Sequence, residues 1–306
     1  MKWIIDTDPG IDDAAAIITA IRSGLDVIGI TAVFGNSPLH HTLRNSLRLV
    51  ELLDADVPVH GGAEQALLEP PHHALDVHGE DGFGNTFLPD PARRPAEGHA
   101  VDFLLESARR HPSQLSILAL GPLTNLALAI AQDRSFCRAV HHIVLMGGTS
   151  DARGNTTAVA EFNVHADPEA AAIVFASGIP ITMVPWETTL KAVLGPEMVD
   201  VLQSSDRPLA RTFFQASRVL ARLVQERLGL KGLVLCDLVA AAVALDPGIM
   251  TEKAHAHVAV ETCGTIARGL TAVDYAGLSG RPPNATVCLG VDRRRVGELF
   301  LKALTD

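Results

Sequence analysis

The chain has 306 residues, of which 47% are hydrophobic and 20% are charged, and its formal net charge is −10 at pH 7. This composition excludes disordered and fibrous proteins and supplies enough apolar residues for a buried core. A negative chain repels DNA and RNA unless it carries a local basic patch. The arginine runs at 93–94 and 293–295 are typical of solvated surface or helix ends, so no nucleic-acid partner is expected.

Strand-like and helix-like patterns alternate along the first 185 residues. In chain order we expect a strand at 3–5, a helix at 12–22, a strand at 27–33, a helix at 39–53, a strand at 115–120, a helix at 123–131, a strand at 143–146, a helix at 168–176 and a strand at 181–185. Residues 196–246 are largely helical, and strands at 258–262 and 286–290 and a helix at 296–303 follow. This alternation predicts an α/β fold with a single open, mostly parallel central sheet flanked by helices.

The chain shows no internal repeat and no low-complexity linker, so we expect one domain over residues 1–306. Residues 66–97 are rich in Pro, His, Asp and Gly and are expected to form a long loop. Long loops in compact domains are often functional.

The cysteines and the N-terminus suggest a cytoplasmic protein. Cys137, Cys236, Cys263 and Cys288 form no CxxC pair and fit no zinc site, which favours a reducing compartment. The first apolar run ends at Asp6 and is too short for a signal peptide or a membrane span. We therefore expect no membrane partner.

The sharpest motif is an acidic cluster near the N-terminus, Asp6-Thr7-Asp8-Pro9-Gly10-Ile11-Asp12-Asp13. It lies where a predicted strand meets a predicted helix, and ligands of open α/β sheets bind at such strand ends. A single aspartate there is usually a helix cap, but one cap needs only one carboxylate. Four carboxylates repel one another unless a cation is present, and oxygen ligands favour calcium or magnesium.

A second interpretation of the same motif is a magnesium-dependent phosphatase of the haloacid-dehalogenase type, because Asp6 and Asp8 match its DxD pattern. Gly10 stands where that class usually has Thr or Val. The later chain offers no compelling lysine and acidic pair, so this interpretation is not favoured.

Other strand ends carry polar residues that could face the same crevice. Asn36 follows the second strand, where it either lines the crevice or caps the next helix. The Gly121-Pro122-Leu123-Thr124-Asn125 turn either starts a helix or offers a backbone carbonyl, which is a natural calcium ligand.

Three later segments carry further candidates. Glu161 and Asn163 are two residues apart, so an extended backbone would point both to one face, where they suit sugar hydroxyls. Asp237 opens an apolar helix and is either a cap or a site residue, and Cys236 before it is by default a small buried residue. His78 lies in the long loop with Gly79 and Gly82 nearby, and these glycines could let a substrate approach closely.

Together these motifs resemble the inosine-uridine preferring nucleoside hydrolases over essentially the whole chain. The resemblance rests on the acidic cluster and on Gly35-Asn36, His78-Gly79, Gly121 to Asn125, Met146-Gly147-Gly148, Asn155, Ala160-Glu161-Phe162-Asn163, Asp167-Pro168-Glu169-Ala170 and Asp237. It implies a Rossmann-like nucleoside hydrolase fold and an enzyme that cleaves purine or pyrimidine ribonucleosides to ribose and free base. It also implies a role in nucleoside salvage and a homodimer or homotetramer.

The resemblance further implies a role for each site residue. One Ca²⁺ would be held by Asp8, Asp13, Asp237 and the Leu123 carbonyl, and Asp8 would act as base toward a calcium-bound water. The ribose 2′- and 3′-hydroxyls would bind Asp12, Asn36, Asn163 and Asp237, and the 5′-hydroxyl would bind Asn155 and Glu161. His78 and Met146 would lie near the sugar or the base.

The sequence departs from the family pattern at one position, which concerns protonation of the leaving base. Well-known members have a histidine that can protonate the base, and Cys236 stands at that position. A thiol is a weak hydrogen-bond donor with an ordinary pKa of about 8.5. His78 or the segment 205–230, with Phe213, Phe214 and Arg222, is a candidate substitute. The alternatives are a calcium-dependent riboside-binding protein without turnover and a hydrolase of an unusual riboside.

Overall fold

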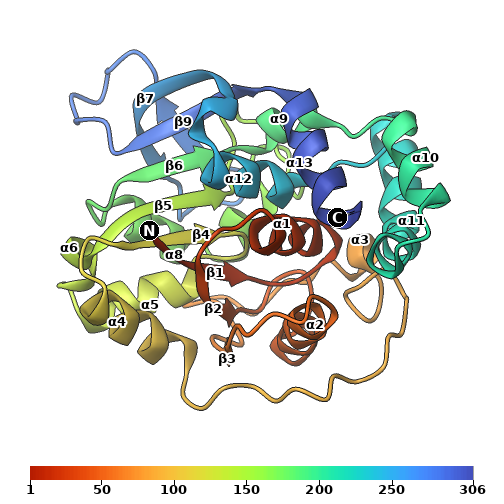
Figure 1. The fold of residues 1–306 in the computed structure, drawn as a ribbon. Coiled ribbons are helices and arrows are strands. Elements are labelled where there is room, and N and C mark those ends of the chain that lie inside the picture. The colour runs from red at the N-terminus through yellow and green to blue at the C-terminus, as the bar shows by residue number, and fades with distance from the viewer. Residues whose placement is uncertain (306) are drawn as a thin grey trace.

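The computed structural model describes residues 1–305 and contains a nine-stranded sheet in the order β3-β2-β1-β4-β5-β6-β9-β7-β8 (Figure 1). Neighbouring strands from β3 to β9 are parallel, and β7 pairs antiparallel with both β9 and β8. The strands are β1 (Lys2–Thr7), β2 (Val27–Ala32), β3 (Val59–Gly61), β4 (Leu115–Ala119), β5 (Val140–Met146), β6 (Ile181–Val184), β7 (Met250–Val260), β8 (Thr271–Asp274) and β9 (Ala285–Val291). The expected open, mostly parallel sheet is confirmed.

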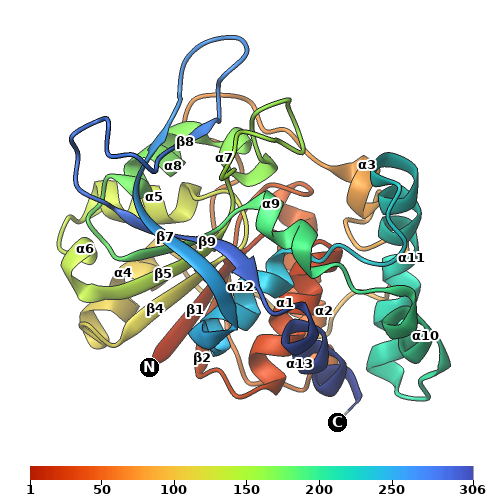
Figure 2. The same cartoon turned by 90° about the horizontal axis from the view of Figure 1, so that it is seen from above.

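Helices cover both faces of this sheet (Figure 2). They are α1 (Ile11–Arg22), α2 (Leu39–Leu52), α3 (Leu75–His78), α4 (Ala100–Arg110), α5 (Thr124–Gln132), α6 (Phe136–Ala139), α7 (Phe162–Ala166), α8 (Pro168–Phe175), α9 (Trp186–Thr189), α10 (Pro196–Ser204), α11 (Pro208–Leu228), α12 (Cys236–Leu245) and α13 (Arg293–Thr305), with 3-10 turns η1 (Leu190–Ala192) and η2 (Pro247–Ile249). Within residues 1–305, none of these helices combines the length and apolar character needed to cross a bilayer.

The sheet separates two buried clusters, because successive residues of a strand point to opposite faces. Ile5 of β1 packs with α1, α2, α12 and α13, whereas its neighbour Ile4 packs with α4, α5 and α8. The central strands β1 and β4 are almost wholly buried and largely apolar, because helices cover both faces of a parallel sheet.

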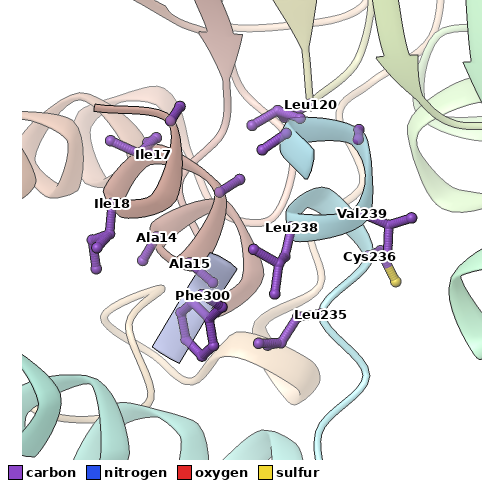
Figure 3. Close-up of a cluster of buried hydrophobic side chains, with 14 of the residues drawn as sticks. Ala14, Ala15, Ile17, Ile18, Leu120, Leu235, Cys236, Leu238, Val239 and Phe300 are labelled. Atoms are coloured by element: carbon purple, nitrogen blue, oxygen red, sulfur yellow. The ribbon is translucent and has the colours of Figure 1, made fainter. Parts of the chain in front are cut away.

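The pairing of α1 with α12 prepares the functional site (Figure 3). Small and branched side chains of α1, among them Ala14 and Ala15, pack with Leu238 and Val239 of α12 and with Phe300 of α13. The small residues let the two helices approach closely. Each helix begins with acidic residues, so this packing brings their carboxylates together.

Several elements differ from the sequence expectation. The helical segment at 196–246 contains α10, α11 and α12 but is interrupted at 229–235, because Gly229 adopts a left-handed conformation (φ 66°) that ends α11. The antiparallel β7 begins at Met250, well before the apolar run at 258–262, because its first half is partly exposed and its sequence is mixed. The elements β3, β8 and α4 were not expected. Residues 66–97 are mostly loop, with α3 as a single helical turn.

Candidate functional site

The predicted site residues gather at the carboxyl ends of the parallel strands. Asp8 follows β1, Asn36 follows β2, Gly121 follows β4 and Met146 ends β5. The N-termini of α1 and α12 complete this edge of the sheet with aspartates. The topology therefore brings together residues that lie up to 229 positions apart in the sequence, from Asp8 to Asp237.

An acidic cluster lies at the base of the site. Asp12, Asp13 and Asp237 each place one carboxylate oxygen within 4.8 Å of the others, which is a spacing that could hold a metal ion. Burial raises the pKa of Asp237 well above its ordinary value, and the charges of Asp12 and Asp13 raise it further. A bound cation would neutralise the repulsion between these carboxylates and would offset the cost of burying their charge. The cluster is therefore suited to a cation.

Asp8 lies beside this cluster and is fully buried. Burial, and next the charge of Asp13, raises the pKa of the Asp8 carboxyl well above its ordinary value. Its Oδ2 accepts a hydrogen bond from the Asn36 backbone N–H at 2.7 Å, whereas its Oδ1 has no hydrogen-bond partner. A buried carboxylate oxygen without a partner is costly, and a cation ligated by it would offset that cost.

Two glycines make room for the Asp8 carboxylate. A Cβ atom on Gly35 would lie 2.0 Å from Oδ2, and one on Gly121 would lie 2.5 Å from Oδ1. Any side chain at either position would therefore displace the carboxylate. This close approach explains the glycines at the ends of β2 and β4.

Asn36 joins the acidic residues to one another. Its side-chain amide donates to Asp13 Oδ2 at 3.0 Å and to the Asp8 carbonyl at 3.2 Å. Asp13 also accepts from Thr7 Oγ1 at 2.6 Å and from the Gly10 N–H at 2.9 Å. The helix-capping role considered for Asp13 is therefore present and coexists with membership of the cluster.

Leu123 is buried at the start of α5. Its carbonyl accepts the first hydrogen bond of that helix, from Ala127 N at 2.9 Å, which leaves one lone pair for another partner. Leu123 lies two residues after Gly121, whose Cα adjoins the Asp8 carboxylate.

A cavity of about 470 Å³ opens above the cluster, a size within the usual range for small-molecule sites. All nine residues predicted to bind substrate line it: Asp12, Asn36, His78, Met146, Asn155, Glu161, Asn163, Cys236 and Asp237. Asp8, Asp13 and Leu123 lie beneath the lining. The predicted ligand-binding residues are therefore near one another, with the substrate candidates above the metal candidates.

Glu161 and Asn163 reach the cavity by a geometry that differs from the expected extended one. Glu161 is the N-cap of α7, and its carboxylate accepts from the backbone N–H groups of Asn163, Val164 and Gly148 at 2.8–3.1 Å. Asn163 lies inside that helix and donates from Nδ2 to the Leu120 carbonyl at 2.7 Å. Burial raises the pKa of Glu161 to about 7. The expectation of an extended segment is wrong because capping begins a helix here.

His78 ends α3 and packs over the acidic turn. Its Nδ1 accepts the Ile11 N–H at 3.2 Å, and burial lowers its pKa to about 4. The ring is therefore neutral and carries its proton on Nε2. A Cβ atom on Gly10 would lie 2.3 Å from Nδ1, so the glycine is needed for the histidine to pack there.

The loop after His78 is organised around Asp81. The Asp81 carboxylate accepts from the backbone N–H groups of Phe83, Asn85 and Phe87 at 2.7–2.9 Å. Asn45 of α2 donates to the Asp81 carbonyl at 3.2 Å and to the Pro9 carbonyl at 3.3 Å. The His78 loop and the acidic turn are thus both tied to α2.

Apart from Arg227, the wall of the cavity along α11 is apolar, and it was not predicted residue by residue. We call it the aliphatic wall, and it consists of Leu220, Leu223, Val224 and Leu228 of α11 together with Val234. Trp186, at the start of α9, also lines the cavity. No local motif marks these residues, because α11 and the segment after it reach the cavity only through tertiary packing.

The three residues named as substitutes from the segment 205–230 do not line the cavity, although Arg227 of the same segment does. Phe213 is 2% exposed and packs edge-on against Phe300, with ring centroids 5.0 Å apart. Arg222 is exposed and pairs with Glu226 on the outer face of α11. Phe214 is also absent from the lining. The helical periodicity explains this difference, since α11 turns other residues toward the cavity.

The structure also argues against the phosphatase interpretation. Asp6 is fully buried, and its Oδ1 accepts from Thr31 Oγ1 at 2.6 Å and from Asn125 Nδ2 at 2.8 Å. A carboxylate that is held inside the sheet and does not line the cavity cannot attack a substrate there.

Comparisons with known proteins agree with this geometry. Residues 3–298 match the model of the family described as inosine-uridine preferring nucleoside hydrolase. The chain is 38% identical over 311 residues to the pyrimidine-specific ribonucleoside hydrolase RihA of Citrobacter koseri, covering 98% of this chain and 97% of that protein.

Solved structures of nucleoside hydrolases are also similar to this chain. A plant nucleoside hydrolase superposes with a TM-score of 0.93 at 35% identity, covering 99% of this chain and 98% of the other. A purine-preferring ribonucleoside hydrolase from Gardnerella vaginalis superposes with a TM-score of 0.93 at 30% identity, covering 100% and 98%.

Proposed function

Because the chain belongs to the inosine-uridine preferring nucleoside hydrolase family and is an N-glycosyl hydrolase of ribonucleosides, we propose that it works with one Ca²⁺ and uses Asp8 as its base. The observation that carries the proposal is the buried acidic cluster beneath a cavity lined by all nine expected substrate residues. The family membership argues against a riboside-binding protein without turnover.

The donor set fits calcium. Asp8, Asp13, Asp237 and the Leu123 carbonyl would supply oxygen ligands only, which a hard cation prefers. The Asp8 Oδ1 atom without a partner supports this assignment. When bound, the ion would lower the pKa of a water molecule at the floor of the cavity. Asp12 and Asp237 both share the cluster and line the cavity; we assign Asp12 to the sugar and Asp237 to both the ion and the sugar.

Asp8 then accepts a proton from the attacking water. The water oxygen bonds to C1′ of the ribose, and the C1′–N bond breaks with its electron pair leaving on the base. The sugar passes through an oxocarbenium-like state, which nearby carboxylates stabilise. The base finally takes up one proton, and Asp8 returns its proton to solvent.

The polar residues of the cavity would position the ribose. Asp12, Asn36, Asn163 and Asp237 would bind the 2′- and 3′-hydroxyls, and Asn155 and Glu161 the 5′-hydroxyl. Met146 and His78 line the cavity between the strand ends and α11, where they would contact the sugar or the base. A 2′-deoxyribose would leave buried polar groups unpaired, so deoxyribonucleosides should be poor substrates.

The aliphatic wall would face the base across the cavity from the carboxylates. The similar proteins differ in what their names say of the base, since one is pyrimidine-specific and another is purine-preferring. The base preference of this chain therefore has to be measured.

The decisive experiment measures ribose release from inosine, adenosine, guanosine, uridine, cytidine and 2′-deoxyuridine, with and without a calcium chelator. We expect release from at least one ribonucleoside that the chelator abolishes and added calcium restores, with about one calcium per chain in metal analysis. Full activity in chelator, or zinc as the bound metal, would contradict the calcium proposal while leaving the hydrolase activity intact.

We also propose that the chain forms one domain and acts in the cytoplasm as a homodimer or homotetramer. A single sheet that runs through both halves of the chain supports the first part. Light scattering coupled to size-exclusion chromatography would test the oligomer, and limited proteolysis would test the domain.

A further inference from the structure

The loop that follows β5 leads from the sheet to one side of the cavity. Residues 147–156 of this loop belong to no helix or strand, and Gly154, Asn155 and Thr156 at its far end line the cavity. A loop without secondary structure takes its shape from hydrogen bonds to other elements. The placement of Asn155 therefore depends on what holds the residues before it.

A carboxylate of α9 gathers the first part of this loop. Glu187 Oε2 accepts hydrogen bonds from the Ser150 N–H at 2.9 Å and from Ser150 Oγ at 3.2 Å. Its Oε1 accepts from the backbone N–H groups of Asp151 at 3.0 Å and Arg153 at 3.4 Å. Hydrogen bonds to a carboxylate are stronger than those between neutral groups, so four donors on one side chain fix the course of the backbone at 150–153.

The turn at 150–153 contains a backbone conformation that is unfavourable by itself. Ala152 has a φ of 63°, in the left-handed region that residues with a side chain rarely adopt. Such a conformation persists only where the surroundings impose it. The residues on both sides of Ala152, Asp151 and Arg153, donate to the same oxygen of Glu187. The turn therefore depends on this carboxylate.

Asn155 lies two residues after this turn and has bonds of its own. Its Oδ1 accepts from the Phe162 N–H at 2.9 Å, and its backbone N–H donates to the Ala160 carbonyl at 3.2 Å. With Oδ1 engaged, the Nδ2 group is the donor that Asn155 can offer to a ligand in the cavity. The direction of that group depends on the backbone that enters from Arg153, and hence on the turn that Glu187 holds.

We propose that Glu187 is a positioning residue, which directs Asn155 toward the 5′-hydroxyl of the ribose by holding the turn at 150–153. This inference rests on the proposed hydrolase function and deepens it. Glu187 lies outside the cavity lining, so it acts on the substrate through Asn155. A ribonucleoside with a free 5′-hydroxyl gains from this arrangement, whereas a riboside without that hydroxyl does not.

The test compares the best ribonucleoside of the panel with its 5′-deoxy analogue. In Glu187→Ala we expect kcat/KM for the ribonucleoside to fall about fivefold, the effect of one hydrogen bond, and that for the analogue to change less than about twofold. The ratio of the two values therefore falls. Asn155→Ala should lower the ratio in the same way. The double variant should have the ratio of Asn155→Ala alone, because the two residues act on the substrate through one group.

Two further variants separate positioning from stability. Glu187→Gln has nearly the same shape and keeps one carbonyl oxygen as acceptor, so its ratio should lie between those of the wild type and Glu187→Ala. If Glu187→Ala does not fold, the ratio of Glu187→Gln decides the question. Glu169→Ala is the matched control, because Glu169 is a partly buried glutamate that pairs with Arg268. It should lower the melting temperature and leave the ratio unchanged.

The outcomes distinguish the inference from the function on which it rests. A wild-type ratio in folded Glu187→Ala or in Asn155→Ala would overturn the inference and leave the hydrolase activity in place. A further fall of the ratio in the double variant would also overturn it, since Glu187 would then act by another route. If the wild type releases ribose from no member of the panel, the proposed function fails and the inference falls with it.

Discussion

The two walls of the cavity are built in opposite ways. The wall at the strand ends consists mainly of buried carboxylates and amides, several of which are held by hydrogen bonds from other elements, as Asn36 holds Asp8 and Asp13. The aliphatic wall consists of side chains from one long helix and the segment after it, and the charged group beside it is Arg227, which pairs with Asp76. Under the proposed function, hydrogen-bonding groups position the sugar, whereas the base meets mainly apolar side chains.

The largest effect should come from the strand-end wall. Asp8→Asn removes the proposed base and a proposed calcium ligand, and it should lower kcat/KM by about 10⁴-fold. The variant should fold, because it also removes one charge from a crowded acidic cluster. Ribose release and the melting temperature are the measurements. Wild-type rates in this variant would end the proposed mechanism.

Asn36→Ala tests whether the acidic residues depend on their amide. It removes the bonds from Nδ2 to Asp13 and to the Asp8 carbonyl, and should weaken calcium binding by roughly 10- to 100-fold. Isothermal titration with calcium measures this directly. Asn155→Ala is the matched control, since Asn155 lines the same cavity and bonds to Phe162 instead. Equal affinities in both variants would show that Asn36 does not orient the ligands.

Cys236→His tests whether the residue at the start of α12 contacts the leaving base. A histidine there would present a stronger donor to the base, and should change the ratio of purine to pyrimidine kcat/KM by about tenfold. The exposed Cys263 offers a control, because Cys263→His lies outside the cavity lining and should keep the ratio. An unchanged ratio in the first variant would make Cys236 a packing residue.

The smallest effect should come from the aliphatic wall. Leu223 is partly exposed, and Leu223→Ala should raise KM by about threefold and leave kcat unchanged, because the contact is the same before and during bond cleavage. Steady-state kinetics with the best substrate of the panel provides the measurement. A large fall in kcat would mean that this wall takes part in the chemical step.

The difference between the two walls also explains which cavity residues could be predicted from the sequence. Asp8, Asp12 and Asp13 are neighbours in the chain, and the parallel topology places Asn36 and Met146 beside them. Local motifs and one general rule about strand ends therefore suffice to predict that the residues proposed to bind the sugar lie together. Leu223 and Trp186 carry no motif, and their position depends on how α11 and α9 pack.

The strands of the sheet also differ in how well the sequence predicts them, with the central strands predicted better than the edge strands. The buried central strands contain apolar runs and were predicted at the right places, although β1 extends beyond the expected residues 3–5 and β5 begins three residues before the expected start. The edge elements β3 and β8 are short, and β7 begins in a polar stretch that is partly exposed, so their patterns are weak. Asn163 was expected in extended backbone because the capping role of Glu161 does not show in the two-residue spacing alone.

The loop around Asp81 has a mechanical consequence. Three of its backbone amides point inward to one carboxylate, and Asn45 fastens both this loop and the Pro9 turn to α2. Because these amides are hydrogen-bonded although they belong to no helix or strand, we expect them to exchange with solvent deuterium more slowly than the unbonded amides of an ordinary loop. The rim of the cavity beside His78 is therefore expected to keep its shape when a ligand enters.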